Sequence, residues 1–193
     1  MNKTETRNLV TNDIEIRELE DGSKTIKGYA VKWEMKSNTM GYFKRFKEQF
    51  VKGAFTDTLR NDDQVALWSH DTSKVLGRTK NQTLRLYEDD IGLRFEMDLP
   101  NTTIGNDAYE SIKRRDVEGV SFAFVKQDEK WDESDLDNIT RTIHKAKLIE
   151  VSPVAFPAYP DSEVTTRSRD PYQIHLDEKR SEKRKRLYLQ TLI

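Results

Sequence analysis

One hydroxyl lies inside the most apolar and β-prone stretch of the chain, Gly119–Val125. Successive side chains of a strand point to opposite faces, so Ser121 points away from Phe122 and Phe124. Both faces of this stretch are largely apolar, which is typical of a central strand that is buried on both sides. A lone hydroxyl costs free energy there unless it forms a hydrogen bond. Ser121 is therefore either a core residue bonded to a backbone carbonyl or a nucleophile that a neighbouring base activates.

The chain has three histidines that could act as this base. His70 follows the strand-like stretch 64–68 and begins a polar loop, and strand ends of this kind are common positions for catalytic groups. His144 lies in the middle of a predicted strand, and His175 lies in the charged C-terminal region. We favour His70 as the general base, and the alternative is a structural histidine at an exposed turn.

Glu150 could orient such a histidine. It shares a face of the predicted strand 140–151 with apolar residues, so its carboxylate is expected to be partly buried. Burial of a carboxylate is costly unless the group is paired or holds a histidine. An edge position or a salt bridge to a lysine is the alternative. His70, Ser121 and Glu150 together supply the groups that acyl transfer requires.

Other chemistries lack their motifs. No glycine-flanked G-x-S-x-G elbow surrounds Ser121, which argues against an α/β-hydrolase. The sequence contains no Walker loop, no H-E-x-x-H motif and no cysteine, so we expect neither a cofactor nor a metal ion.

The charge balance also limits the partners. Lys plus Arg (33) against Asp plus Glu (34) gives a net charge of −1, which provides no global electrostatic case for nucleic acid or a membrane. The polar start and the lack of a long apolar run predict a soluble intracellular protein without a signal peptide or anchor.

The apolar patterns predict a mainly β fold with a few helices, in the α+β class. A length of 193 residues suits one domain. Alternation predicts a β-hairpin and further strands, over residues 14–33, 64–68, 74–79, 83–87, 93–99, 119–125 and 140–151. Helices are expected near residues 50–60 and 102–115.

Three stretches are expected to lack regular sheet structure. Residues 126–138 are charged and predict an exposed turn or loop, and prolines argue against regular structure over 152–161. There, Phe156 and Tyr159 are expected to hold the loop against the core. We expect one domain over residues 1–161 and a charged tail over 162–193, which is either mobile or an isolated helix outside the core.

Eight short motifs occur in the order in which they occur in the tailed-bacteriophage prohead proteases, and the chain resembles that family over about residues 14–165. The motifs are Gly28-Tyr29-Ala30, Gly53-Ala54-Phe55, Ser69-His70-Asp71, Val75–Thr79, Leu84-Arg85-Leu86, Gly92–Phe95, Gly119–Phe124 and Glu150–Tyr159. Val120 and Ala123 stand where many members carry Met and Gly, which leaves the nucleophile unchanged. The family consists of capsid-maturation serine endopeptidases that share the β-barrel fold of the herpesvirus assemblins.

This resemblance implies a closed or partly open, antiparallel-rich β-barrel with flanking helices. It also implies that Ser121 is the nucleophile, His70 the general base and Glu150 the third member of the site. The herpesvirus relatives use a second histidine at the third position, so His144 is the alternative to Glu150. We expect backbone amides near Gly77-Arg78 to form the oxyanion hole, because a glycine lets the main chain approach closely.

The resemblance further implies a serine endopeptidase that cleaves the scaffolding segment of the phage capsid protein and also cleaves itself. Its partners would be the major capsid protein and, as in the assemblins, a second copy of the chain. It would act in the host cytoplasm, inside the immature capsid, and the charged tail would serve packaging or simply solubility. The alternative is a non-enzymatic assembly or scaffolding protein on the same fold, in which Ser121 is only a core residue.

Overall fold

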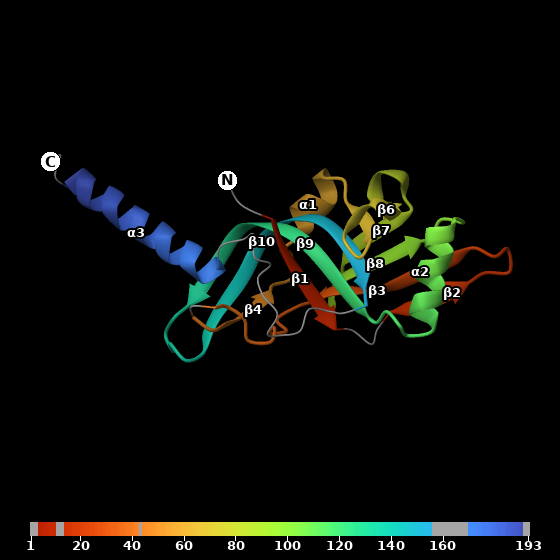
Figure 1. Ribbon diagram of the computed structural model, residues 1–193. Coiled ribbons are helices and arrows are strands. Elements are labelled where there is room, and N and C mark those ends of the chain that lie inside the picture. The colour runs from red at the N-terminus through yellow and green to blue at the C-terminus, as the bar shows by residue number, and fades with distance from the viewer. Residues whose placement is uncertain (1–3, 11–13, 43, 156–169, 191–193) are drawn as a thin grey trace.

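The computed structural model describes residues 4–10, 14–42, 44–155 and 170–190. In this part of the chain, strands dominate and form two sheets with three α-helices beside them (Figure 1). Sheet A contains β1 (Thr4–Val10), β4 (Phe46–Phe50), β5 (Val65–Trp68), β6 (Asp71–Arg78), β9 (Gly119–Asp132) and β10 (Ile139–Val154). Sheet B contains β2 (Glu15–Glu18), β3 (Lys24–Lys32), β7 (Leu84–Glu88) and β8 (Gly92–Asp98). The helices are α1 (Thr56–Asn61), α2 (Thr103–Lys113), α3 (Pro171–Gln190) and a 3₁₀ turn over Thr79–Asn81.

Sheet A is organised around β10. Its strands lie in the order β1-β9-β10-β5-β6, and β4 also pairs with β10. β10 runs antiparallel to β9 and parallel to β4 and β5, and the sheet curls into a half-barrel (Figure 1). The prediction of a mainly β, partly open barrel with flanking helices is therefore confirmed.

The expected loop over residues 126–138 is largely wrong. β9 continues to Asp132, and its outer half pairs with β10 from Thr140 onwards. The charged residues of this hairpin are typical of a loop, but Arg141 is only 1% exposed, because carboxylates surround it. Irregular structure does not begin at Ser152 either, since β10 extends to Val154.

Two strands of sheet A have no counterpart in the predicted elements. β4 alternates buried Phe46, Glu48 and Phe50 with more exposed residues, so its buried face includes a carboxylate. β1 contains charged residues that are typical of a polar lead, yet it pairs with β9 along seven register positions.

The helices partly follow the predictions. α2 matches the expected helix, with Thr102 as its N-cap and with Ala108 and Ile112 buried. α1 begins only at Thr56, because the chain before it turns at Gly53, where φ is +92°.

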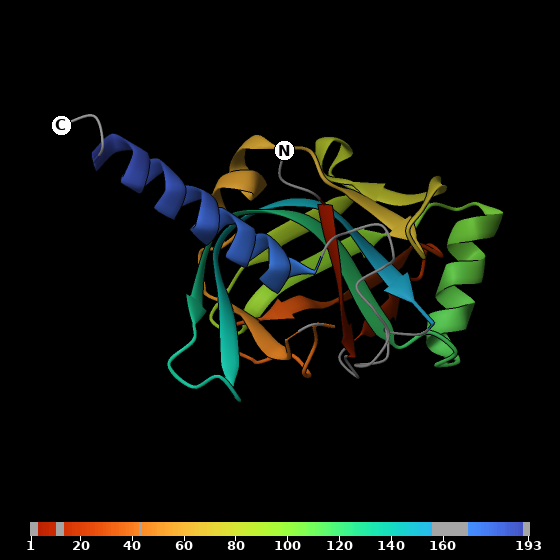
Figure 2. The ribbon, with the colours of Figure 1, turned by 60° about the vertical axis from the view of Figure 1, so that its left-hand side comes forward.

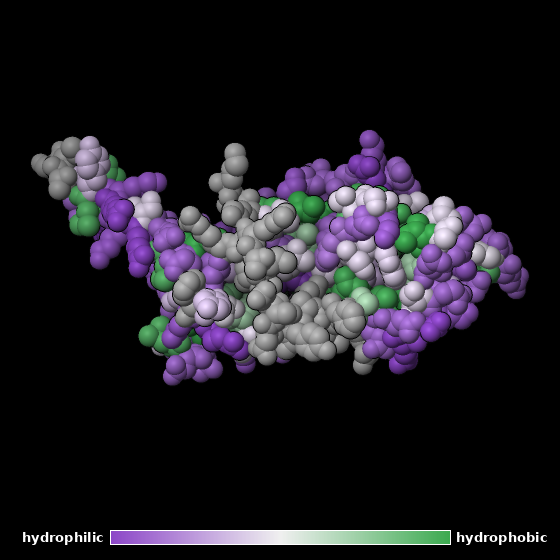
Figure 3. Space-filling model, in the orientation of Figure 1, coloured by the Kyte–Doolittle hydropathy of each residue, from purple (hydrophilic) through white to green (hydrophobic). Residues whose placement is uncertain are grey.

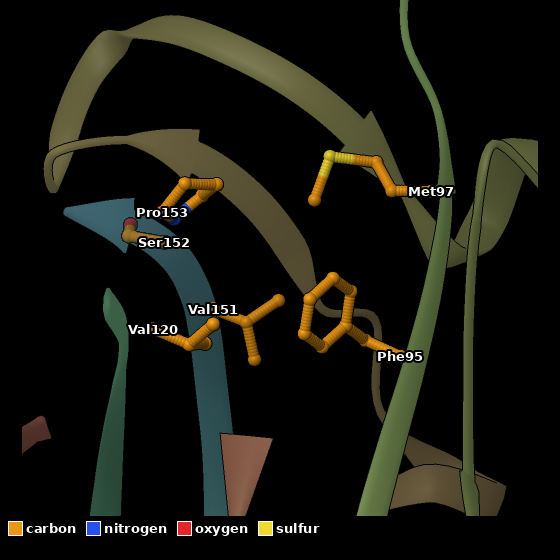
Figure 4. Close-up of a pocket in the computed structure, with 6 residues that line it drawn as sticks. All are labelled: Phe95, Met97, Val120, Val151, Ser152 and Pro153. Atoms are coloured by element: carbon orange, nitrogen blue, oxygen red, sulfur yellow. The ribbon is translucent and has the colours of Figure 1, made fainter. Parts of the chain in front are cut away.

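The core lies between the two sheets. Phe95 and Met97 of β8 point toward Val120 and Val151 of sheet A, and the packing leaves no space for a water molecule (Figure 4). Phe122 belongs to the same core, so this is the face of β9 opposite to Ser121. The apolar contacts between the sheets thus hold β9 and β10 against sheet B through the face opposite to Ser121.

The C-terminal region forms a helix that is anchored at its start. Tyr172 is buried and packs with Phe46, Ile139 and Trp131, while the rest of α3 projects from the body (Figures 1 and 2). Mainly hydrophilic side chains cover the projecting part (Figure 3). The expected anchoring by Phe156 and Tyr159 concerns residues outside the described ranges, and the domain boundary at residue 161 stays a prediction.

No helix in the described ranges is long and apolar enough to cross a membrane.

Candidate active site

His70 lies in the two-residue turn between β5 and β6. Ser69 and His70 both have positive φ values, 51° and 63°, as in the hairpin turns that match the twist of the strands. Such a conformation costs roughly 1–3 kcal/mol for each residue that is not glycine. The turn is held by β10, because the Ser69 amide donates to the Pro153 carbonyl and the His70 amide donates to Ser152 Oγ, both at 3.2 Å.

Glu150 contacts the imidazole directly. Its Oε1 lies 2.7 Å from His70 Nδ1, and the carboxylate is buried, with 5% of the residue exposed. A carboxylate oxygen can only accept this hydrogen bond, so Nδ1 carries the proton and Nε2 is left as an acceptor. The His70 side chain is 36% exposed. The arrangement presents an oriented imidazole that can take up a proton at Nε2.

Ser152 connects Glu150 to His70, although the sequence analysis gave it no role. Its hydroxyl donates to Glu150 Oε2 at 2.6 Å and accepts the amide hydrogen of His70. Both oxygens of Glu150 are therefore occupied, and the carboxylate is fixed in one orientation. The spacing Glu-x-Ser within a strand was the available signal, because residues i and i+2 point to the same face.

Ser121 lies on the neighbouring strand. In the register of β9 and β10 it is the direct partner of Ser152, and Ala123 is the partner of Glu150. Directly opposed residues of an antiparallel pair share a face, so Ser121 and Glu150 lie on the same side of sheet A. Ser121 is completely buried, and its hydroxyl donates to the Arg7 carbonyl at 3.1 Å. Within the described residues, no hydrogen bond joins Ser121 to His70.

His144 is far from this group. It is exposed and lies six residues before Glu150 on β10, a distance on the order of 20 Å along a strand. Three register shifts against β9 separate the two positions. The carboxylate of Glu150, rather than His144, contacts His70.

The expected oxyanion position near Gly77 is not supported. The amide of Arg78 already donates to Thr83 Oγ1 at 2.9 Å. A Cβ atom at Gly77 would lie 3.0 Å from the Thr83 carbonyl oxygen and 3.2 Å from Met97, so close packing explains this glycine.

The described residues contain no group of three or more His, Asp or Glu side chains that could hold a metal ion.

Three comparisons relate this geometry to known proteins. No protein with curated annotation matches the sequence. The solved structure of the bacteriophage T4 capsid assembly protease has the same fold, with a TM-score of 0.51 and 15% identity over 78% of this chain and 98% of that one. Residues 12–175 match the family described as caudovirus prohead serine protease. This match covers most of the chain, and the chain therefore belongs to the caudovirus prohead serine proteases.

Proposed function

We propose that the chain is a serine endopeptidase whose nucleophile is Ser121, whose general base is His70 and whose third member is Glu150. The observation that carries the proposal is the 2.7 Å contact between His70 Nδ1 and the buried Glu150 carboxylate. Glu150 lies on β10, the strand that pairs with the strand of Ser121. A buried carboxylate that holds an imidazole in one tautomer is the positioning half of a catalytic triad.

In the proposed reaction, His70 Nε2 accepts the proton of the Ser121 hydroxyl while Oγ forms a bond to the carbonyl carbon of the substrate. The tetrahedral intermediate collapses, the carbon–nitrogen bond breaks, and His70 gives its proton to the leaving amine. Water then attacks the acyl-enzyme in the same manner, which releases the new carboxylate and restores Ser121. The Glu150 carboxylate accepts the hydrogen bond from His70 Nδ1 and stabilises the imidazolium that forms at each step.

The proposed substrates are the scaffolding segment of the phage major capsid protein and the chain itself. Membership of the prohead protease family and the likeness to the T4 capsid assembly protease support this choice. We infer that the enzyme acts in the host cytoplasm inside the prohead. A homodimer would fit the behaviour of the related assemblins.

A serine-directed acylating probe tests the proposal. The full chain is incubated with a fluorophosphonate, alone and with its capsid protein, and the adduct is located by peptide mapping. We expect an adduct on Ser121 in the native wild type and none on Ser121 in His70→Ala, because the hydroxyl needs its base. Ser111→Ala, on the surface helix α2, is the matched control and should label like the wild type.

One observation favours the alternative function, a non-enzymatic assembly protein. Ser121 is fully buried and already bonded to a backbone carbonyl, which is how a core serine is normally satisfied. If the probe modifies exposed serines but never Ser121, with or without the capsid protein, the assembly protein becomes the better interpretation.

A further inference from the structure

The first strand of the chain lies directly against the proposed nucleophile. β1 pairs antiparallel with β9 and covers the edge of that strand (Figure 2). Asn8 is the register partner of Ser121, and the Ser121 hydroxyl donates to the carbonyl of Arg7 at 3.1 Å. β1 therefore brings a peptide carbonyl of this same chain to the group that is expected to attack peptide carbonyls.

This hydrogen bond has a consequence for activity. A serine hydroxyl has one proton to donate, and the proton of Ser121 is engaged with the Arg7 carbonyl rather than with His70. The edge of β9 is also the place where an extended peptide could add as a further strand and gain main-chain hydrogen bonds. While β1 occupies that edge, no second peptide can pair there.

Two ion pairs hold β1 against the rest of the fold. Arg141 forms two hydrogen bonds to Glu5, at 2.6 and 2.9 Å, and Arg7 forms two to Glu48, at 2.6 and 3.0 Å. Arg141 and Glu48 belong to the rest of the fold and are both buried. β1 thus presents an acidic and a basic side chain, two residues apart, to a matching buried pair.

The same charges allow β1 to leave. Without β1, Arg141 keeps its contacts to Glu48 at 2.7 Å and to Glu129 at 2.6 Å, and Glu129 keeps Lys126 at 2.8 Å. The departing strand removes one negative and one positive charge, so two acidic and two basic groups remain paired. Detachment of β1 therefore leaves no buried charge unpaired. An unpaired buried charge would cost several kcal/mol.

We propose that the edge of β9 beside Ser121 is the docking edge for the extended peptide that is to be cut, and that β1 occupies it as a substrate-like strand until it is displaced. This inference rests on the proposed function. The partner is an extended segment that pairs antiparallel with β9 and carries an acidic residue for Arg141, two positions before the carbonyl that reaches Ser121. β1 precedes residues 12–175, which match the family, so the covering strand lies outside the matched part of the chain.

A reversible cross-link in the full chain tests this inference. The sequence has no cysteine, so Thr4→Cys with Val125→Cys introduces a single pair. These residues are register partners on β1 and β9, and partner Cα atoms of antiparallel strands are about 4.5–5.5 Å apart, which suits a disulfide. The pair lies four positions from Ser121 along β9. The single variant Thr4→Cys is the matched control, and intact mass confirms the bond.

With the disulfide formed, β1 cannot leave, and we expect cleavage of the capsid protein to slow by about tenfold or more, with full recovery after reduction. The control should be indifferent to the reductant. Equal, Ser121-dependent cleavage by the oxidised and reduced forms would overturn the inference and leave the proposed function standing. If neither the wild type nor the reduced pair cleaves the capsid protein, the proposed function fails and the inference falls with it.

Discussion

The buried charge cluster around Arg141 provides the sharpest test of how this fold is held together. Arg141 is only 1% exposed and contacts three carboxylates, those of Glu5, Glu48 and Glu129. Replacing it by Met keeps a long side chain and removes the charge. Among the described residues, two of the cations that contact these three carboxylates remain, Arg7 and Lys126, so negative charge in the cluster then exceeds positive charge.

Breaking a buried ion pair from one side costs about 3–5 kcal/mol. For a chain of this size, 1 kcal/mol corresponds to roughly 2–4 °C, so the midpoint of thermal unfolding of Arg141→Met should fall by about 6–20 °C. The midpoint of Arg141→Lys should lie between those of the wild type and Arg141→Met, because lysine keeps the charge but loses the two parallel hydrogen bonds to Glu5. Arg17→Met, at an exposed position of β2, is the matched control.

The pH dependence separates a charge effect from lost packing. Burial alone would raise the pKa of Glu5, but its hydrogen bonds to Arg141 and the charge of Arg7 outweigh burial and lower that pKa from 4.5 to about 2. A lowered carboxyl pKa stabilises the folded state above pH 4.5, and this contribution disappears as the pH falls toward 2. The difference in unfolding free energy between the wild type and Arg141→Met should therefore shrink over that range. A loss no larger than that of Arg17→Met, or one that does not change with pH, would refute the reasoning.

Three further substitutions follow from the site and the fold. Glu150→Gln should lower the rate of capsid-protein cleavage by about 10²–10⁴-fold, because the amide no longer fixes the tautomer of His70, whereas the exposed His144→Ala should cleave like the wild type. Ser152→Ala should retain the fold by circular dichroism yet lower kcat by about tenfold, since Glu150 and the His70 amide both lose a partner. The free energy of unfolding of Gly92→Ala, measured with urea, should be lower by about 1–3 kcal/mol, because the added Cβ would lie 1.9 Å from the Val31 carbonyl oxygen.

The sequence allows much of the fold to be predicted wherever one side of an element is apolar. The alternation of β8 and the apolar stripe of α2 both predict the observed elements, because their buried faces consist of hydrophobic residues. The contact between His70 and Glu150 could also be expected from the sequence, because His70 lies at a strand end and Glu150 on an apolar strand face.

The parts that sequence reasoning missed bury charges instead. Glu5 in β1, Glu48 in β4 and Arg141 in β10 are each typical of exposed residues, so β1 and β4 were not expected and the β9–β10 hairpin was expected to be a loop. Their burial is possible only because Arg141 pairs with Glu48 and Glu5, which lie 93 and 136 positions away in the sequence. A pattern read along the chain does not contain that pairing.

The most direct test of the central proposal is the intact mass of the full chain, incubated with its capsid protein over several days. Wild type, Ser121→Ala and Ser111→Ala are compared under the same conditions. We expect the wild type and Ser111→Ala to shorten the capsid protein and to trim themselves, while both proteins stay whole with Ser121→Ala. If Ser121→Ala cleaves like the wild type, or if nothing is cleaved by any of the three, Ser121 is not the nucleophile of a capsid protease.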